Sequence, residues 1–424
     1  MKIYLENVRT FDGEHQIPLR RLTVLTGENS SGKSTLMGMV STMGSESGFP
    51  FDPKFDAQPY NLGSFDTIAT FKGGRYGRAK HFTVGFEADG PEKGTTRTVR
   101  ARYESDQGRV SLANLSVNDG ARSLVIEVTN RDSSHYETKV RLRLENGEEE
   151  FDLITPRTDH AEDLRHMMMS VVFERSNMSS RSVRALIELT GMTGMMRRVV
   201  SVAPIRTRPQ RVYSQIEQRF EAAGDHIPFV LDRLLTDGDT KAEKKRIQSA
   251  LERLGRESGL FDSVSIKKLG IHSPDPFHIM VNVAGRARNL IDVGYGVSQV
   301  LPVVVETVLS AKNSMILMQQ PEVHLHPRAQ AALGTFFCDM VKSRGCHLVL
   351  ETHSDFILDR IRQEVAMQTI PADWVQILFF HREGYVTRVH PLRLDQRGNV
   401  QNAPNVYRDF FFREEIQLLT RTKE

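Results

Sequence analysis

Several features that would classify a chain at once are scarce in this sequence. It has two cysteines, Cys338 and Cys346, too few for a disulfide framework or a four-ligand zinc site. No run of roughly 18 apolar residues is present, and the N-terminal segment lacks the apolar stretch of a signal peptide. Lys and Arg number 56 and Asp and Glu 53, so a formal net charge of +3 does not make the whole surface a nucleic-acid binding face. We therefore expect a cytoplasmic protein without a membrane span.

The hydrophobic pattern predicts an α/β protein with a sizeable core. The 424 residues suit two or three structural units, and 39% of them are hydrophobic. Alternation from His81 to about Leu153 predicts antiparallel sheet, whereas residues 160–258 show helical spacing. Later, short apolar runs alternate with helical segments, which predicts a parallel sheet covered on both faces. The expected segments are 1–158 (phosphate loop and antiparallel lobe), 159–260 (helical insertion) and 261–424 (C-terminal half).

The same periodicity places the elements of the last segment. The expected strands are Val264–Ile271, His278–Val283, Met315–Met318, His347–Leu350, Ile377–Phe380 and Tyr385–Val389. The expected helices begin near Gly296 and cover Ala329–Val341 and Phe356–Val365.

The strongest motif is a loop between an expected strand, Leu22–Thr26, and a helix expected from about Gly32. It reads Gly27-Glu28-Asn29-Ser30-Ser31-Gly32-Lys33-Ser34-Thr35 and fits G-x-x-x-x-G-K-[ST] at every fixed position. In such a loop the backbone N–H groups point into one concavity and the helix N-terminus adds partial positive charge. Lys33 would reach the β- and γ-phosphates and Ser34 would hold Mg²⁺. A turn with an incidental lysine would not need the strand–loop–helix order, so a nucleoside triphosphate site is predicted.

Three further segments at strand or helix ends are candidates for the same site. Gln319 and Gln320 follow an apolar strand, where P-loop ATPases carry one acid for Mg²⁺ and a second for the attacking water. His353 follows the next apolar strand, where it could approach the γ-phosphate or serve only the structure. The start of a later helix suits a second anion site or an ordinary capped turn. Its candidate residues are Gly294, Gly296, Ser298 and Gln299.

In this order the motifs resemble those of the ABC-type ATPase heads of the SMC and OLD families, and in particular stand-alone bacterial AAA-type ATPases found near phage-defence genes. GENSSGKST resembles their Walker A motif, VGYGVSQVLP their signature, QQPEVHLHP their Walker B motif and D-loop, ETHSDFILDRIR their switch-histidine segment, and GNVQNAPNVYRDFF their C-terminal end. The resemblance implies an ABC-ATPase-like P-loop head with a mixed or parallel core sheet, an antiparallel β lobe and a helical insertion.

The resemblance also implies how the protein would act. Two chains would form a head-to-head homodimer around two ATP molecules with Mg²⁺, each held between the Lys33 loop of one chain and Gly294–Gln299 of the other. This ATP-driven dimerisation would regulate a separate effector in bacterial anti-phage defence, and hydrolysis would release the dimer. OLD proteins carry a nuclease domain after the ATPase, and the residues after His353 are too few for one.

One departure concerns the Walker B motif. The resembling families carry Glu or Asp where Gln319 stands, and an acid is common where Gln320 stands. An amide offers no carboxylate to Mg²⁺ and is no general base. Either the chain is a naturally slow hydrolase, or Gln319 is a substitution that traps ATP; the intact remaining motifs favour the second. Glu322 and Glu351 stand outside the usual positions and receive little catalytic weight, and Gln58 is a candidate for the mobile glutamine that senses Mg²⁺.

An arginine-rich stretch runs from Arg175 to Arg211, with Glu188 as its only acid. Its arginines are Arg175, Arg181, Arg184, Arg197, Arg198, Arg206, Arg208 and Arg211. Forked contacts to nucleic-acid phosphates or to an acidic partner are one interpretation, and pairing with acids such as Glu148–Glu150 is the other. Arg206 also resembles an arginine of the ATPase head. Seven methionines overlap the stretch and suit a helix core or a partner interface. They are Met167, Met168, Met169, Met178, Met192, Met195 and Met196.

Three rival functions fit part of these observations. An ATP-bound scaffold that does not hydrolyse ATP is consistent with Gln319. An SMC-like DNA-associated ATPase shares the motifs, but no heptad pattern for a long coiled coil is present. A transporter ATPase subunit would carry a signature closer to LSGGQ and would lack the arginine-rich stretch.

Overall fold

The computed structural model describes residues 1–44, 48–74, 77–90, 94–130, 135–145, 147–156, 180–190, 198–214, 220–236, 241–270 and 275–407. The chain divides into two compact units. The first comprises Met1–Leu19, Ser34–Val199 and Glu383–Thr387, and the second Arg20–Lys33, Val200–Arg382 and Arg388–Glu424. The units cross the segment boundaries expected at residues 158 and 260, because the strand before the phosphate loop pairs with strands from the C-terminal half.

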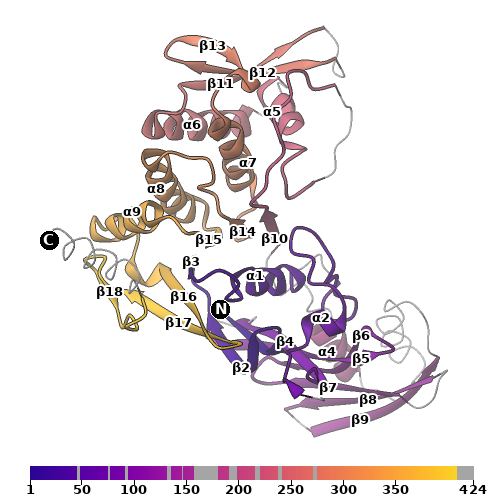
Figure 1. Ribbon diagram of the computed structural model, residues 1–424. Coiled ribbons are helices and arrows are strands. Elements are labelled where there is room, and N and C mark those ends of the chain that lie inside the picture. Colours follow the sequence, from indigo (N-terminus) through magenta and orange to yellow (C-terminus); the bar gives the residue numbers. More distant parts are fainter. Residues whose placement is uncertain are drawn as a thin grey trace, which may run out of the picture. The chain divides into compact units, whose positions relative to one another are not determined.

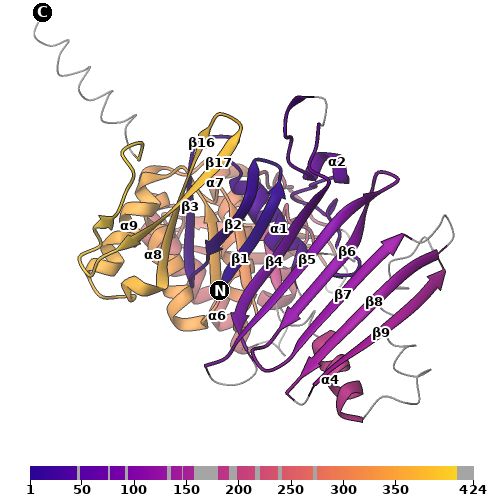
Figure 2. The ribbon, with the colours of Figure 1, turned by 90° about the horizontal axis from the view of Figure 1, so that it is seen from below.

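The first unit is built on an antiparallel sheet. Its described strands have the order β2-β1-β4-β5-β6-β7-β8-β9, which Figure 2 shows as one continuous ribbon surface. The strands are β1 (Lys2–Val8), β2 (Phe11–Pro18), β4 (His81–Asp89), β5 (Thr96–Asp106), β6 (Arg109–Asn118), β7 (Ser123–Asn130), β8 (His135–Leu144) and β9 (Gly147–Pro156). The expected antiparallel block is confirmed and gains β1 and β2 at one edge.

Alternation explains why this sheet has one buried face. Phe82, Val84 and Phe86 of β4 are buried, and successive strand residues point to opposite faces. Phe82 stacks on Tyr103, with ring centroids 5.4 Å apart. Burial raises the pKa of Tyr103 well above its usual value, and its hydroxyl donates a hydrogen bond to the carbonyl of Pro50 (2.7 Å).

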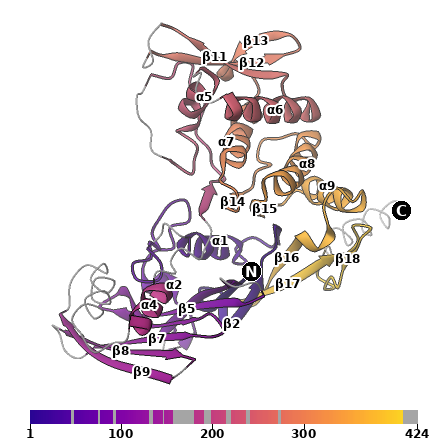
Figure 3. The same ribbon diagram turned by 180° about the vertical axis from the view of Figure 1, so that it is seen from behind.

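Helices are few in the described part of the first unit. They are α1 (Lys33–Thr42), which begins at the end of the phosphate loop, α2 (Phe65–Ile68) and α4 (Ser180–Thr190). Figure 3 shows α4 beside β7 and β8, and its Leu186 and Leu189 are buried. Residues 157–179 and 191–197 lie outside the described residues, and with them Arg175, Arg197 and all seven methionines of the predicted insertion.

The second unit has a sheet with a parallel centre. Its described strands have the order β10-β14-β15-β3-β16-β17-β18 (Figure 1). The strands are β3 (Leu22–Gly27), β10 (Val199–Val202), β14 (Met315–Gln319), β15 (His347–Glu351), β16 (Val375–Glu383), β17 (Val386–Leu394) and β18 (Val400–Gln401). β14 pairs in parallel with β15, β15 with β3, and β3 with β16. The interpretation of residues 160–258 as helix is wrong at Val199–Val202, whose β-branched run forms β10.

Helices and a smaller sheet complete this unit. The small sheet has the order β11-β12-β13. The elements are α5 (Ile227–Thr236), α6 (Lys241–Ser258), β11 (Ser263–Lys268), β12 (Phe277–Val283), β13 (Arg286–Asn289), η3 (Leu290–Asp292), α7 (Tyr295–Leu309), α8 (Pro327–Arg344), α9 (Asp355–Ala366) and η4 (Ala372–Trp374). The strands and helices expected from periodicity are confirmed, with ends that differ by a few residues. Among the helices of the described ranges, none is long and apolar enough to cross a membrane.

The core of the second unit explains why the central strands read as uninterrupted apolar runs. All five residues of β14 are buried, and Leu348, Val349 and Leu350 of β15 are fully buried. Such runs are typical of strands buried on both faces, and alternate residues, such as Ile316, Met318 and Leu350, pack in one core with α7 and α8. α8 begins with Pro327 after its N-cap His326 and ends at Gly345, whose φ of 66° suits glycine. The packing of these strands with the helices holds the strand ends in register at one edge of the sheet.

The aromatic cluster around Phe82 should dominate the stability of the first unit. We expect Phe82→Ala to lower the free energy of unfolding by about 3–5 kcal/mol, because it leaves a cavity beside Tyr103. Tyr385→Ala, in the same unit and 87% exposed, is the control and should change it by less than about 0.5 kcal/mol. Urea unfolding followed by near-ultraviolet circular dichroism measures both; equal effects would contradict the assignment of the core.

Candidate functional site: a phosphate loop and three strand ends

The phosphate loop begins at a point where only glycine fits. Gly27 ends β3 with a φ of +125°, and a Cβ added there would lie 1.9 Å from the carbonyl oxygen of Phe380 on β16. The next residue, Glu28, donates its backbone N–H to that same oxygen (3.1 Å). The first glycine of the motif therefore lets the chain leave the sheet while it stays close to the neighbouring strand.

The rest of the loop is held by its own hydrogen bonds. Ser30 and Gly32 have φ values of 58° and 96°, a left-handed region that turns successive N–H groups toward one side. The buried Ser31 donates its hydroxyl to the carbonyl of Glu28 (2.7 Å). The Glu28 carboxylate accepts the backbone N–H of Arg382 (3.1 Å). The loop is thus preformed, with Asn29 and Ser30 exposed.

Lys33 lies inside this loop rather than in solvent. Its side chain is buried, and Nζ donates to the carbonyls of Gly27 (3.1 Å) and Glu28 (2.6 Å). Burial lowers the pKa of Lys33, and the charges of Glu351 and Glu28 partly oppose this. The next residue along α1, Ser34, is exposed. A buried ammonium at the end of a strand and an exposed hydroxyl beside it are the groups that the motif predicts.

Two strand ends meet beside each other at Gln319 and Glu351. These residues end β14 and β15 and are partners in the parallel register. The Gln319 side-chain amide donates to Glu351 Oε2 (3.0 Å), and both side chains are buried. Gln320 donates its N–H to the Glu351 carbonyl (2.7 Å) and has a φ of 44°. The Walker B segment therefore turns away from the sheet directly after its pairing with Glu351.

Arg206 supports this turn from within the protein. It is 2% exposed, and its Nη2 donates to the carbonyls of Gln319 (3.3 Å) and Gln320 (3.1 Å). Burial lowers the pKa of Arg206 to about 10, against the charge of Glu322. Its Nε and Nη1 have no hydrogen-bond partner within the described part of the chain. The structure thus joins Arg206 to the turn after β14, a contact that the sequence does not show.

The switch-histidine segment is tied to the same turn. Thr352 donates its N–H to the Leu25 carbonyl of β3 (3.1 Å), and the His353 N–H donates to Glu322 Oε1 (2.9 Å). Ser354 caps α9 by accepting the N–H of Ile357 (3.1 Å). His353 itself is exposed. Glu322 therefore joins the Walker B segment to the switch-histidine segment through its hydrogen bond from the His353 N–H, and the imidazole of His353 stays accessible.

The signature segment forms the start of α7, but only some of its predicted residues are exposed to solvent. Ser298 and Gln299 are 7% and 2% exposed, and Ser298 donates its hydroxyl to the Tyr295 carbonyl (2.7 Å). Gly296 packs against the Walker B loop, where an added Cβ would lie 2.8 Å from the His324 carbonyl. Gly294 and Tyr295 are exposed. At this end of α7 the accessible residues are thus Gly294 and Tyr295, and Ser298 and Gln299 are buried.

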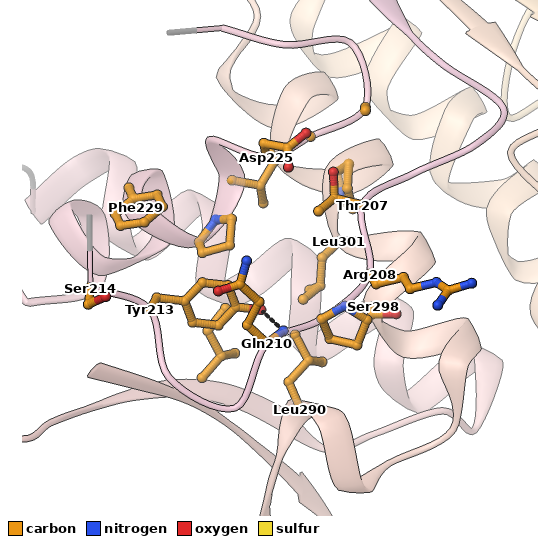
Figure 4. Close-up of a pocket in the computed structure, with 17 residues that line it drawn as sticks. Thr207, Arg208, Gln210, Tyr213, Ser214, Asp225, Phe229, Leu290, Ser298 and Leu301 are labelled. Carbon is orange, nitrogen blue, oxygen red and sulfur yellow. Dashed lines mark hydrogen bonds between the residues drawn. The ribbon is translucent and has the colours of Figure 1, made fainter. Parts of the chain in front are cut away.

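A small cavity lies behind the signature helix. It has a volume of about 110 Å³ and is lined by Ser298 and Leu301 of α7 and by Tyr213 and Gln210 of the preceding segment. Figure 4 shows the Tyr213 hydroxyl accepting the N–H of Gln210 (3.0 Å). Its lining mixes aromatic, apolar and single polar groups, so the cavity by itself indicates no ligand.

Three further residues singled out from the sequence are Gln58, Cys338 and Cys346. Gln58 belongs to the first unit, where it is exposed and precedes a cis peptide bond to Pro59. Within the described residues no group of three or more His, Cys, Asp or Glu could hold a metal. Both cysteines are buried and free, and burial raises the pKa of each thiol.

Several arginines of the basic stretch are paired. Arg181 contacts Glu145 (3.0 Å), Arg184 contacts Glu188 (3.0 Å), and Arg211 makes two hydrogen bonds to Asp292 (2.6 and 2.9 Å). In the described ranges, pairing with acids therefore accounts for three members and burial for Arg206. The partners are other acids than the Glu148–Glu150 run considered from the sequence.

The structure gives two residues of this region neighbours that the sequence does not show. Glu351 opens the switch segment, and only the strand register shows that it lies beside Gln319. Tyr295 lies inside the signature, where its ring contacts that of His324 (centroids 4.9 Å apart). An acid directly at the end of an apolar strand was the available signal for Glu351.

The burial of Lys33 leads to a stability prediction. A lowered pKa means that protonation of Lys33 is penalised in the folded chain, so the penalty is fully present at neutral pH and disappears as pH rises toward 10.5, the ordinary pKa of a lysine. We expect Lys33→Met to raise the thermal midpoint without nucleotide at pH 7, and the gain to shrink as the pH approaches 10. Calorimetry measures this, with the exposed Lys312→Met as control. A lower midpoint for Lys33→Met than for Lys312→Met at pH 7 would contradict it.

Part of the chain is similar in sequence to a known protein family. Residues 196–359 match the sequence model of a family described as "AAA domain, putative AbiEii toxin, Type IV TA system". The matched segment includes Arg206, the signature, Gln319 and His353, and leaves out the phosphate loop. Among proteins with curated descriptions, none matches this sequence.

Solved structures supply the likeness in fold. An Smc head bound to the C-winged helix domain of ScpA is similar with a TM-score of 0.50 and 12% identity, over 93% of this chain and 98% of that one. The SMC head domain from Thermotoga maritima has a TM-score of 0.39 and 13% identity, over 93% and 98% of the two chains. An Smc head with an extended coiled coil from Pyrococcus furiosus, bound to the C-terminal domain of ScpA, has 0.42 and 10%, over 100% and 99%. The likeness to the first of these heads is one of fold. The chain has the fold of an ABC-type, SMC-like P-loop ATPase, and residues 196–359 are similar to the sequence model of the AAA-domain family.

Proposed function

We propose that the protein binds ATP with Mg²⁺ at residues 27–35, hydrolyses it, and associates with a second copy in the ATP-bound state. The observation that carries this proposal is the preformed loop, with the buried ammonium of Lys33 inside it at the end of the central strand β3. Backbone N–H groups of a loop and of a helix start bind a phosphate chain without further ordering. A binding function therefore requires little rearrangement of the backbone.

Each residue of the loop has a role in this proposal. Gly27, Asn29, Ser30, Ser31 and Gly32 shape the phosphate cradle, and Lys33 exchanges its carbonyl contacts for the β- and γ-phosphates. The exposed Ser34 hydroxyl holds Mg²⁺, and Thr35 continues the helix start. When bound, Mg²⁺ neutralises phosphate charge. Gln58 remains the candidate for the glutamine that senses this ion.

The Walker B segment limits the rate of hydrolysis. Gln319 and Gln320 carry no carboxylate, so neither is a general base. The exposed His353 can approach the γ-phosphate, while Arg206 keeps the turn in place through its bonds to two carbonyls. We infer a slow ATPase, and a scaffold that never hydrolyses ATP is the alternative. Phosphate release in single-turnover conditions distinguishes the two.

Association would use the N-terminus of α7. Gly294 and Tyr295 are exposed there, next to Asp292, which is paired with Arg211. In the proposed dimer this end of α7 meets the nucleotide of the second chain, and the helix N-terminus favours the negative charge of phosphate. Gly296, Ser298 and Gln299 are buried and stabilise this end of α7 through their packing.

The biological role that we propose is control of a separate effector protein in the cytoplasm, in bacterial anti-phage defence. Its support is the resemblance of the motifs and the toxin–antitoxin wording of the matched family. Nucleic acid is the alternative partner, as in an SMC-like DNA-associated ATPase. The pairing of Arg181, Arg184 and Arg211 with acids weakens that alternative.

Nucleotide binding and association can be separated by two variants. We expect Lys33→Ala to lose affinity for a fluorescent ATP analogue by at least about tenfold, because a charged contact to phosphate contributes 1.5–3 kcal/mol. Tyr295→Arg should retain that affinity and lose ATP-dependent association in light scattering. Tyr385→Arg, at an exposed hairpin turn, is the matched control and should do neither. Unchanged affinity and association in Lys33→Ala would reject the proposed function.

A further inference from the structure

We propose that Glu351 supplies the carboxylate toward the Mg²⁺ of bound ATP that the Walker B position lacks, and that Gln319 positions it. This inference rests on the proposed function, because it names a residue of the same site. It assigns a role to the acid that opens the switch-histidine segment, to which the motifs themselves give no metal-binding role.

The sheet order brings Glu351 to the right edge. β15 lies between β14 and β3, so its last residue has the Walker B strand on one side and the phosphate-loop strand on the other. Glu351 is in register with Gln319 on β14 and with Leu25 on β3, two residues before Gly27. Neighbouring strands are about 4.8 Å apart. Glu351 is therefore one strand from β3, whereas Gln319 is two strands from it.

Burying the carboxylate of Glu351 costs free energy, so we do not expect an acid without a role at this position. Glu351 is 6% exposed, and carboxylates are rarely buried unless a partner compensates their charge. Its charge acts on Lys33, whose pKa it raises against the effect of burial. Lys33 and Glu351 thus form a buried pair of opposite charges at the loop. A hard cation with oxygen ligands suits such a carboxylate.

Gln319 fits Glu351 better than an acid would. Its amide donates to Glu351 Oε2 at 3.0 Å. A carboxylate has about four lone-pair sites, so it can accept an amide hydrogen bond and also bind a cation. With Glu at 319, two buried carboxylates would lie beside each other, and one would stay protonated. The amide of Gln319 is therefore a suitable hydrogen-bond donor for the carboxylate of Glu351. The pair carries one negative charge, and this charge lies on β15, one strand closer to the phosphate loop than the Walker B position on β14.

Metal dependence of nucleotide affinity tests this assignment without measuring turnover. A fluorescent ATP analogue is titrated with Mg²⁺ and with EDTA, and Mn²⁺ in the presence of ATP is followed by electron paramagnetic resonance. We expect Glu351→Gln to lose at least about tenfold of the affinity gained from Mg²⁺ and to change the Mn²⁺ spectrum, with unchanged affinity in EDTA. The charge-transfer variant Gln319→Glu/Glu351→Gln should recover part of the gain, and Gln319→Glu alone should not exceed the parent protein.

Glu364→Gln is the matched control. Glu364 is 5% exposed in α9 and accepts the Thr335 hydroxyl (2.8 Å), so it is a buried carboxylate of the same unit without contact to the strand ends. It should keep the full Mg²⁺ effect. Thermal midpoints of all variants identify unfolding, and Glu351→Asp, which keeps the charge, should retain part of the effect if Glu351→Gln is unstable.

The outcomes separate the two proposals. A folded Glu351→Gln chain with the full Mg²⁺ gain and the parent Mn²⁺ spectrum overturns the role of Glu351 and leaves ATP binding standing. A parent protein that binds the analogue equally with Mg²⁺ and with EDTA also overturns it. A parent protein that binds no analogue in either condition overturns the proposed function itself.

Discussion

The common register of the parallel strands β14, β15 and β3 is the constraint on which the rest of the site depends. Parallel strands in register end at one edge, so Gln319, Glu351 and the loop after Gly27 meet there although they come from distant parts of the chain. Apolar side chains of these strands, such as Val24, Met318 and Leu350, are packed in the core of the second unit and hold the register. The contact of Gly27 with the Phe380 carbonyl then fixes where the loop leaves the sheet.

Charge buried near that edge is the second organising feature. Lys33, Arg206 and Glu351 are almost fully removed from solvent, which a fold tolerates only where their charges and hydrogen bonds compensate one another. Lys33 contacts loop carbonyls, Arg206 contacts the carbonyls of the Walker B turn, and Glu351 accepts the Gln319 amide. Residues with such perturbed surroundings gather at functional sites more often than elsewhere. The free energy spent on their burial is consistent with groups prepared for a ligand.

The pairing of Gln319 with Glu351 changes how the unusual Walker B segment is understood. From the sequence, two glutamines suggest either a slow enzyme or a substitution that traps ATP. In the structure Gln319 has a specific partner in the next strand, and an acid in its place would face another buried acid. Fold similarity to an Smc head at 12% identity does not bear on this detail, because function resides in individual site residues rather than in the fold.

The sequence by itself determined the elements whose signals are local. The phosphate loop followed from nine consecutive residues, and the apolar runs of β14 and β15 and the alternation of β4 followed from period alone. Strand β10 was missed because a run of only four residues, Val-Val-Ser-Val, is too short for its period to distinguish a strand from a helix. Which members of the signature are exposed, and that Glu351 lies beside Gln319, was decided only by tertiary structure. The reason is physical: strand pairing and helix packing join residues that are far apart along the chain, and a pattern of period two or 3.6 carries no information on which distant strand becomes the neighbour.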